Sequence, residues 1–399
     1  MGSGSAGRRA QLHNRERGTR IGYFPEIVTG EDVARFVEKC GKPVKRLGTA
    51  LGGAAIQAVK VGGRKKPAVV VKGGSHGTEI AGVHAALTFL AEDVDSAHEV
   101  YVIPCGSPFD FGGYTRALCH AADEEVDVRN DDECLSVLTR LGRRFYDGEH
   151  FALFHVGGMI FAWVDQTKLD ARKLFYGQMD VLAQQDPRLC AEITGKRIFY
   201  PNAIYYDDGY GPYDQGGLVS LVSRYGWVGN MNGFYDRYDA PEEVRCVREF
   251  CESIKPGLVL DLHESCINAR IPEKLRTSGE ELGNHFLILP SVHVPGSEET
   301  ETPVAEAMVA GTLEAGHKCF TRSQLEAAWG YDETDYYHGY VRHRARSTNS
   351  FFQWVLLFAE ASIVVEPRMD QPCAERVNIH TTAVRAALAK YGQIVEDRG

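Results

Sequence analysis

His76 and Glu79 are the first residues along the chain whose types and spacing could do chemistry. They stand three residues apart in the stretch 72–79, which reads KGGSHGTE and follows the apolar run 67–71. An imidazole and a carboxylate on one loop can converge on a zinc ion, which takes nitrogen and oxygen ligands at about 2.0–2.2 Å. A surface histidine next to a glutamate that favours a helix start explains an isolated pair more simply. A metal site therefore needs further ligands elsewhere in the chain.

His263 is the candidate for the missing ligand. It comes near the end of the apolar stretch 257–265, GLVLDLHES, and so falls at the carboxyl end of an expected strand. Two imidazoles and one carboxylate can hold a catalytic zinc and leave a position for water. Asp261 or Glu264 can orient the His263 ring, and strand alternation favours Asp261 because it points to the same side. For His263 alone, an ordinary strand-end histidine is the simpler alternative.

Glu366 ends a third apolar strand, expected at 361–367. The proline that follows it keeps the glutamate in an extended backbone. A carboxylate beside an activated water can accept the proton of that water and pass it to a leaving nitrogen, as a general base and then acid. An edge-strand glutamate without such a role is the simpler explanation if Glu366 is taken alone.

A parallel sheet is needed to bring these residues together. The apolar run 67–71, the helix-like stretch 80–91 and the short strand 99–104 predict a βαβ unit with a right-handed crossover. Open α/β sheets carry their chemistry at the carboxyl ends of such strands. Another helix is expected to start at 239–243, with Asp239 as its cap, and to lead into the strand that carries His263.

The composition argues against several classes of function. The 399 residues carry a formal net charge of −10, whereas nucleic-acid and anionic-membrane binding need a clustered basic excess. Ten cysteines are scattered without C-x-x-C pairs, no apolar stretch is long enough to span a bilayer, and the first residues lack the apolar core of a signal peptide. We therefore expect a cytoplasmic protein with reduced thiols and no nucleic-acid or membrane partner. Its oligomeric state is not predicted.

We expect one large domain with an insertion. Residues 1–20 read as a flexible lead-in and residues 21–399 as a single hydrolase domain. The region at about 119–225 mixes charge runs, a helical pattern around 169–183 and an aromatic, glycine-rich segment at 205–213. We interpret this region as an insertion or subdomain that shapes a substrate cleft.

The ordered set of motifs resembles the zinc metallocarboxypeptidase superfamily, including its aspartoacylase and succinylglutamate desuccinylase branch. The resemblance runs from about residue 47 to 368 and leaves the insertion unmatched. It implies a three-layer αβα domain with a mixed, twisted eight-stranded sheet, one Zn²⁺ per chain, and hydrolysis of an amide next to a carboxylate. By the same resemblance the metal ligands are His76, Glu79 and His263, and Glu366 is the general base. Arg116, downstream of a P-x-x-x-P turn at 104–108, is the candidate for polarising the scissile carbonyl.

One departure from the superfamily concerns its Asn-Arg pair, which clamps the terminal carboxylate of the substrate. Asn232 matches the asparagine, but Gly233 stands where the arginine belongs, and a glycine provides no bidentate fork. Either Arg237 takes over the clamp, or the substrate has no free α-carboxylate at this position. Tyr337 and Tyr340 are candidates for a mobile tyrosine over the substrate, or else they are packing aromatics.

The sequence thus predicts a zinc-dependent hydrolase of a C–N amide bond, whose substrate is a peptide or a small molecule. A carboxypeptidase and an N-acyl amino acid deacylase or amidase both remain open. The alternative from another class is a catalytically silent zinc-binding member that recognises a partner or ligand through the segment 205–213.

Overall fold

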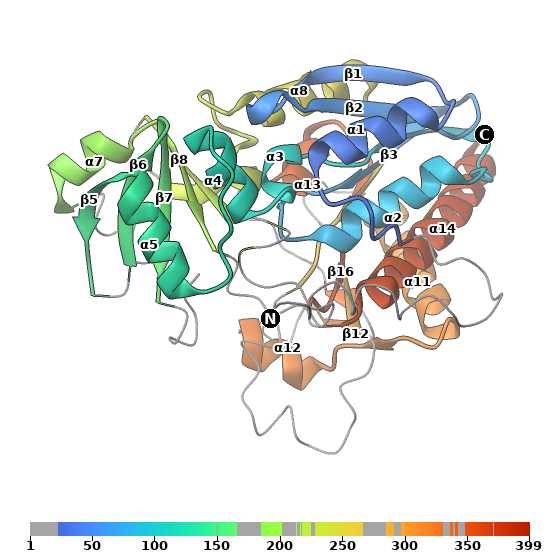
Figure 1. The fold of residues 1–399 in the computed structure, drawn as a ribbon. Helices are drawn as coiled ribbons and strands as arrows, with labels where there is room; N and C mark the ends of the chain where they lie inside the picture. Colours follow the sequence, from blue (N-terminus) through green and yellow to red (C-terminus); the bar gives the residue numbers. More distant parts are fainter. Residues whose placement is uncertain are drawn as a thin grey trace, which may run out of the picture.

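The computed structural model describes most of the chain (Figure 1). The described residues are 23–149, 151–165, 185–201, 213, 216, 218–224, 228–265, 285–290, 297–329, 336–337, 340–341, 348–369 and 371–399. They form a ten-stranded sheet and a six-stranded sheet, with helices packed on the faces of both.

The larger sheet is mixed, and its central strands are parallel. β3 (Lys65–Gly73) pairs in parallel with β4 (His98–Ile103) and β11 (Leu258–Leu262), and β11 pairs in parallel with β16 (Ala361–Pro367). The order across the sheet is β1 (Val44–Thr49), β2 (Ala55–Lys60), β4, β3, β11, β16, β12 (His285–Pro290), β15 (Tyr340–Val341) and β14 (Tyr336–Tyr337), with β13 (Lys318–Cys319) also paired to β12. The predicted mixed sheet is confirmed. It has ten strands rather than eight: seven strands run from β1 to β12, and the three two-residue strands β13, β14 and β15 add to the sheet on the β12 side.

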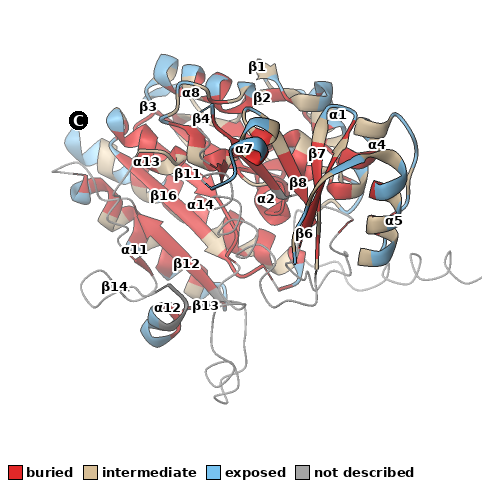
Figure 2. Ribbon diagram, turned by 90° about the vertical axis from the view of Figure 1, so that its left-hand side faces the viewer, coloured by how far each residue is buried: buried red, intermediate tan, exposed pale blue. Residues whose placement is uncertain are grey.

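Helices cover both faces of this sheet, as the predicted three-layer αβα arrangement requires. α2 (Ile80–Ala91), α11 (Glu298–Glu314) and α14 (Cys373–Arg398) pack with α1 (Gly30–Lys39) on one face. The other face is covered by α8 (Glu242–Ile254), the short α13 (Phe351–Trp354) and the 3₁₀ helix η2 (Met231–Phe234). The central strands between these layers are almost wholly buried (Figure 2).

Five strands of the second sheet, β5 to β9, come from the region predicted as an insertion, and β10 follows that region. Its strand order is β10 (Val228–Asn230), β9 (Leu218–Val222), β8 (Arg197–Tyr200), β7 (Met159–Val164), β6 (Phe151–Val156) and β5 (Arg143–Asp147). One face packs against α4 (Tyr114–Ala122) and α5 (Asp131–Leu141), and the other against α7 (Pro187–Ile193). The sheet ends at β10, which continues directly into η2. The division of the chain into one domain with an insertion stays a prediction.

The local elements agree closely with the sequence patterns, with one exception. β3, α2 and β4 form the predicted parallel βαβ unit, and α2 spans the predicted residues. The expected cap of α8 is wrong: the helix begins at Glu242 after Pro241, without a side-chain cap. The Asp239 carboxylate instead accepts a hydrogen bond from the backbone N–H of Arg224, at 2.8 Å, and so ties the end of β9 to the start of this helix.

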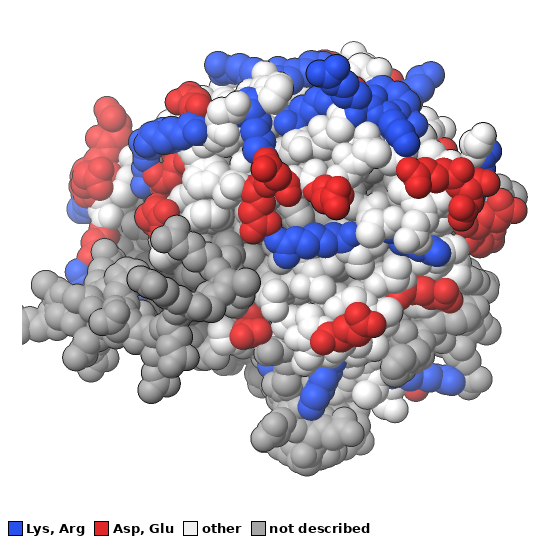
Figure 3. Space-filling model, turned by 90° about the vertical axis from the view of Figure 1, so that its right-hand side faces the viewer, with Lys and Arg blue, Asp and Glu red and all other residues white. Residues whose placement is uncertain are grey.

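The surface carries charges of both signs. Lys and Arg side chains gather along the upper border of the face in Figure 3, and Asp and Glu side chains are interspersed below them. The edge strand β1 exposes Lys45 and Arg46, and charged residues on an edge strand hinder pairing with another chain. None of the helices among the described residues is long and apolar enough to cross a membrane. The nine cysteines in the same part of the chain are free thiols.

Candidate metal centre

His76 lies on the loop between β3 and α2, and two glycines allow this loop its shape. Gly74 has a φ of +63°, a left-handed conformation that glycine adopts without steric cost. At Gly77, a Cβ atom would lie 2.4 Å from the carbonyl carbon of Asp110 in α3 (Pro108–Phe111), so no larger residue fits. The loop ends at Glu79, immediately before α2. His76 and Glu79 therefore both stand at the carboxyl end of β3.

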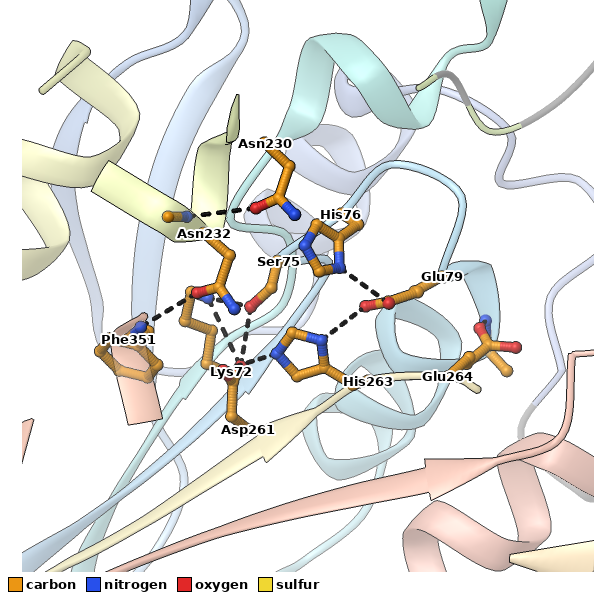
Figure 4. Close-up of polar contacts among 12 residues, drawn as sticks. Lys72, Ser75, His76, Glu79, Asn230, Asn232, Asp261, His263, Glu264 and Phe351 are labelled. Carbon is orange, nitrogen blue, oxygen red and sulfur yellow. Dashed lines mark hydrogen bonds and ion pairs between the residues drawn. The ribbon is translucent and has the colours of Figure 1, made fainter. Parts of the chain in front are cut away.

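The three predicted metal ligands converge on one point (Figure 4). The Glu79 carboxylate lies between two rings: its Oε1 is 2.7 Å from Nδ1 of His76, and its Oε2 is 3.0 Å from Nδ1 of His263. One ligand atom from each of these residues lies within 4.8 Å of the others. Ligand atoms around a tetrahedral zinc at about 2.0–2.1 Å are about 3.3 Å apart, so small movements suffice to bind the ion.

The charges of this cluster also fit a cation. Burial alone would raise the pKa of the Glu79 carboxyl, but the rings of His263 and His76 more than offset this and hold the pKa well below its usual range. Burial opposes a charge on His263, yet Asp261 and Glu79 raise the pKa of this imidazole well above its usual value. The Glu79 carboxyl is thus held in its ionised form, which is the form that binds a cation. The donor set of two imidazoles and one carboxylate is that of a catalytic zinc site.

Asp261 provides the predicted support for His263. Its Oδ2 lies 2.8 Å from Nε2 of His263, which leaves Nδ1 of the ring facing Glu79. Burial raises the pKa of Asp261, but His263 and Lys72 together lower it to about 2. A carboxylate of this kind fixes the tautomer and orientation of a metal-binding histidine.

Glu366 stands next to His263 in the sheet. β11 and β16 are parallel with Leu262 opposite Val365, and the backbone N–H of His263 donates to the carbonyl of Val365 at 3.0 Å. The next step along both strands sets Glu366 beside His263. Val364, two residues before Glu366, packs on the face of the sheet that lies away from α2. Alternate residues of a strand point to the same face, so Glu366 also points to this face, which is the face of the His263 ring. Glu366 is half-buried.

Glu264 points to the other face of the sheet, which excludes it as the support of His263. Its Oε1 accepts a hydrogen bond from the backbone N–H of Ala81 at 2.6 Å, and its Oε2 pairs with the guanidinium of Arg376 in α14. Burial raises the pKa of Glu264 to about 7, although Arg376 opposes this. Glu264 thereby anchors the first turn of α2, directly after Glu79.

His84 and His380 lie buried on the same side of the sheet as Arg376, and they should make the protein sensitive to acid. Burial, helped by Arg376, lowers the pKa of each ring to about 3, and no hydrogen-bond partner of their ring nitrogens lies in the described part. The unfolded chain takes up these protons near pH 6.5, so stability is full above that pH and falls as the pH drops towards 3. At pH 5 each histidine should cost about 2 kcal/mol of unfolding free energy.

Urea unfolding at pH 7 and pH 5 tests this expectation. His84→Phe should make the loss of stability on acidification smaller by about 2 kcal/mol, since the ring no longer titrates. The matched control His120→Gln removes an exposed histidine and should leave the pH dependence as it is. An equal loss of unfolding free energy between pH 7 and pH 5 in His84→Phe and in the parent protein would contradict the lowered pKa of His84.

Asn232 lies close to the cluster but has a structural partner. It sits in η2 with only 8% of its surface exposed, and its Oδ1 accepts the backbone N–H of Phe351 at 3.0 Å (Figure 4). Gly233 donates its own N–H to the side chain of Asn230. Arg237 follows three residues after η2, with 34% of its side chain exposed and its Nε 3.8 Å from Asp236. Its role as a clamp stays a prediction.

The remaining predicted site residues lie apart from one another. Arg116 is exposed on α4, the helix that packs on the second sheet. Tyr340 is 3% exposed and packs in the hydrophobic core on the α2 side of the large sheet. Tyr337 forms β14, and its side chain lies outside the described residues, as does most of the segment 205–213. Tyr213 at the end of that segment is buried and donates a hydrogen bond to Asp131 at 2.6 Å.

Lys72 and Ser75 were not singled out by the sequence patterns, although both contact Asp261. A signal was present: a lysine directly after three valines is unusual in a strand buried on both faces. The contact that gives Lys72 a role is with Asp261, which lies 189 positions further along the chain, and no local pattern reveals which residues of distant strands pair.

No family model matches the chain, and no curated protein matches its sequence. Among solved structures, a metallo-carboxypeptidase from Burkholderia cenocepacia shares 11% identity, with 92% of this chain and 70% of that chain covered and a TM-score of 0.45. Bovine thrombin-activatable fibrinolysis inhibitor, in complex with tick carboxypeptidase inhibitor, shares 11% identity over 92% of this chain and 97% of that chain, with a TM-score of 0.45. A metallo-carboxypeptidase from Pseudomonas aeruginosa, in complex with (2-guanidinoethylmercapto)succinic acid, shares 11% identity over 91% and 69%, with a TM-score of 0.43. Likeness at this level leaves the function to be argued from the site.

Proposed function

We propose that the protein is a zinc-dependent hydrolase of a C–N amide bond. The observation that carries the proposal is the convergence of His76, Glu79 and His263 within 4.8 Å at the carboxyl ends of two parallel strands. Such a site, when it holds zinc, supplies Lewis-acid activation of water and of the scissile carbonyl.

The protein's own residues handle the protons. Glu366, beside His263 in the sheet, takes the proton of the attacking water while the oxygen of that water bonds to the carbonyl carbon. It then gives the proton to the nitrogen as the C–N bond breaks, so that a carboxylic acid and an amine leave. Arg116 is the candidate for stabilising the developing oxyanion, which requires its exposed side chain to reach the substrate.

Metal depletion tests the proposal directly. The purified protein should hold about one zinc per chain, lose hydrolysis of its amide substrates on treatment with a chelator, and regain it with zinc. Substrates for this test are short peptides with free or amidated ends and a panel of N-acyl amino acids. Full hydrolysis by metal-free protein would overturn the proposal, and zinc binding without hydrolysis of any of them would favour a silent binding protein.

Between the two kinds of amide hydrolase, the site favours the deacylase or amidase. Gly233 has no side chain to bind a carboxylate, so the bidentate fork of an arginine is missing at this position. A charge-assisted clamp is worth about 1.5–3 kcal/mol, or roughly 10–150-fold in affinity. Without it, free and amidated peptide ends should differ in kcat/KM by less than about tenfold.

Arg237→Ala is the informative variant for this comparison. We expect it to leave the ratio of kcat/KM for free and amidated substrates unchanged. A large preference for free ends that disappears in Arg237→Ala would instead identify Arg237 as the clamp and the protein as a carboxypeptidase.

A further inference from the structure

Lys72 is a lysine in the core of the large sheet. Its side chain is 2% exposed, and the strand register sets it directly opposite Asp261 on the neighbouring strand β11. Its Nζ donates a hydrogen bond to Oγ of Ser75 and lies 3.4 Å from Oδ1 of Asp261. Burying an ammonium group is costly, so the contacts that Lys72 makes must offset that cost.

Aromatic rings complete the enclosure of this ammonium group. Nζ of Lys72 lies 4.5 Å from the ring centre of Phe351 and 5.7 Å from that of Tyr235. Ring faces attract a cation, most strongly where water is excluded. Lys72 is therefore confined between two rings and a carboxylate, and its position is well defined.

The two carboxylate oxygens of Asp261 contact different partners. Oδ1 accepts the hydrogen bond of Ser75 at 2.8 Å and faces Lys72, whereas Oδ2 faces Nε2 of His263 at 2.8 Å. A histidine that offers Nδ1 to a metal keeps its hydrogen at Nε2 and is neutral. Lys72 is then the full positive charge in contact with Asp261 among the described residues.

We propose that Lys72 is a positioning residue of the metal centre, which holds the Asp261 carboxylate against His263 and so keeps Nδ1 of that ring directed at the metal. The inference rests on the zinc site of the proposed function. It goes beyond that function because Lys72 contacts neither the metal ligands nor the reacting atoms in this arrangement; it acts through Asp261.

The sign of one measurement separates this role from a simple charge effect. A positive charge close to a zinc ion repels it, so if Lys72 were only a nearby charge, its removal would strengthen zinc binding. If Lys72 holds Asp261, its removal weakens binding. Loss of such an outer partner typically costs 10–100-fold in metal affinity, so we expect Lys72→Met to raise the zinc dissociation constant by about that factor.

The experiment is a double-mutant cycle on the zinc dissociation constant, measured by competition with a chelator for the parent protein, Lys72→Met, Asp261→Asn and the double variant. Because Lys72 acts through Asp261, adding Lys72→Met to Asp261→Asn should change the constant by less than about threefold. The control Lys60→Met removes a partly buried lysine of β2 that pairs with Glu99, and it should not alter zinc binding.

Each outcome of this experiment supports or overturns the proposal. Unchanged or tighter zinc binding in Lys72→Met overturns the proposal, and so does an equal loss of affinity in both backgrounds, which indicates general destabilisation. If circular dichroism shows that Lys72→Met does not fold, Asp261→Asn is compared with the double variant, which buries no unpaired charge. A lower zinc affinity in the double variant than in Asp261→Asn overturns the proposal. A parent protein that binds no zinc would overturn the proposed function as well, whereas normal zinc binding in the parent and in Lys72→Met overturns the role of Lys72 alone.

Discussion

Replacing Glu366 by glutamine should lower kcat/KM for amide hydrolysis by about two to four orders of magnitude and leave the zinc content unchanged. Glutamine keeps the size and shape of the side chain but cannot accept the proton of the attacking water. The metal ligands lie directly after β11 and on the loop after β3, so they should be unaffected. Kinetics and zinc analysis on the same preparation measure both quantities.

A matched control comes from the start of the same strand. Glu360 directly precedes β16, 45% of its side chain is exposed, and it pairs with Arg398. Glu360→Gln removes a carboxylate just before the same strand, at the end away from His263, and it should leave kcat/KM close to that of the parent protein. Unchanged turnover in Glu366→Gln would show that another group acts as the base. Loss of zinc in that variant would show that Glu366 serves the metal instead.

The parts of the site that local sequence patterns predicted are those that depend on short stretches of chain. Three valines before two glycines specify both the strand β3 and the turn after it, and α2 spans the stretch predicted for it. The alternation of a single strand was enough to choose Asp261 over Glu264 as the partner of His263. In each case the decisive residues lie within a few positions of one another.

The parts that were missed depend on pairing between distant strands. The role of Lys72 follows from the register that sets it opposite Asp261, and this register is fixed only when the sheet is assembled. The second sheet draws its strands from 143–230, where charge runs and short apolar stretches do not specify which strands pair. Asn232 was identified from the sequence, but its hydrogen bond to Phe351 was not, because the two residues lie 119 positions apart in the chain.

That hydrogen bond connects Asn232, on the proposed substrate side of the site, to the residues around Asp261 that support the metal ligand His263. Phe351 donates its N–H to Asn232 and lays its ring over Lys72, which in turn contacts Asp261. A change at Asn232 therefore alters the packing around Lys72 as well as any substrate contact. Variants of Asn232 should be tested for zinc affinity before a change in KM is attributed to substrate binding.

Glu79→Gln should remove zinc binding rather than turnover alone. The Glu79 carboxylate bridges the two imidazoles at 2.7 and 3.0 Å, and it is the negative charge among the three ligands. An amide in its place offers only a neutral oxygen, so the affinity should fall by more than the 10–100-fold typical of losing an outer partner. Zinc analysis after dialysis measures this directly, and hydrolysis should be lost in the same variant.

Stability provides a second measurement of the same change. A ligand that binds only the folded state stabilises it by about 4 kcal/mol at a concentration of 1,000 times its dissociation constant. Added zinc should therefore raise the unfolding free energy of the parent protein but have little effect on Glu79→Gln. Glu92→Gln, at the far end of α2 with 42% of its side chain exposed, is the matched control and should respond to zinc like the parent. An equal zinc response in Glu79→Gln and Glu92→Gln would place the metal elsewhere. A response lost in Glu79→Gln but kept in Glu366→Gln would separate the residues that hold the metal from the residue that moves the proton.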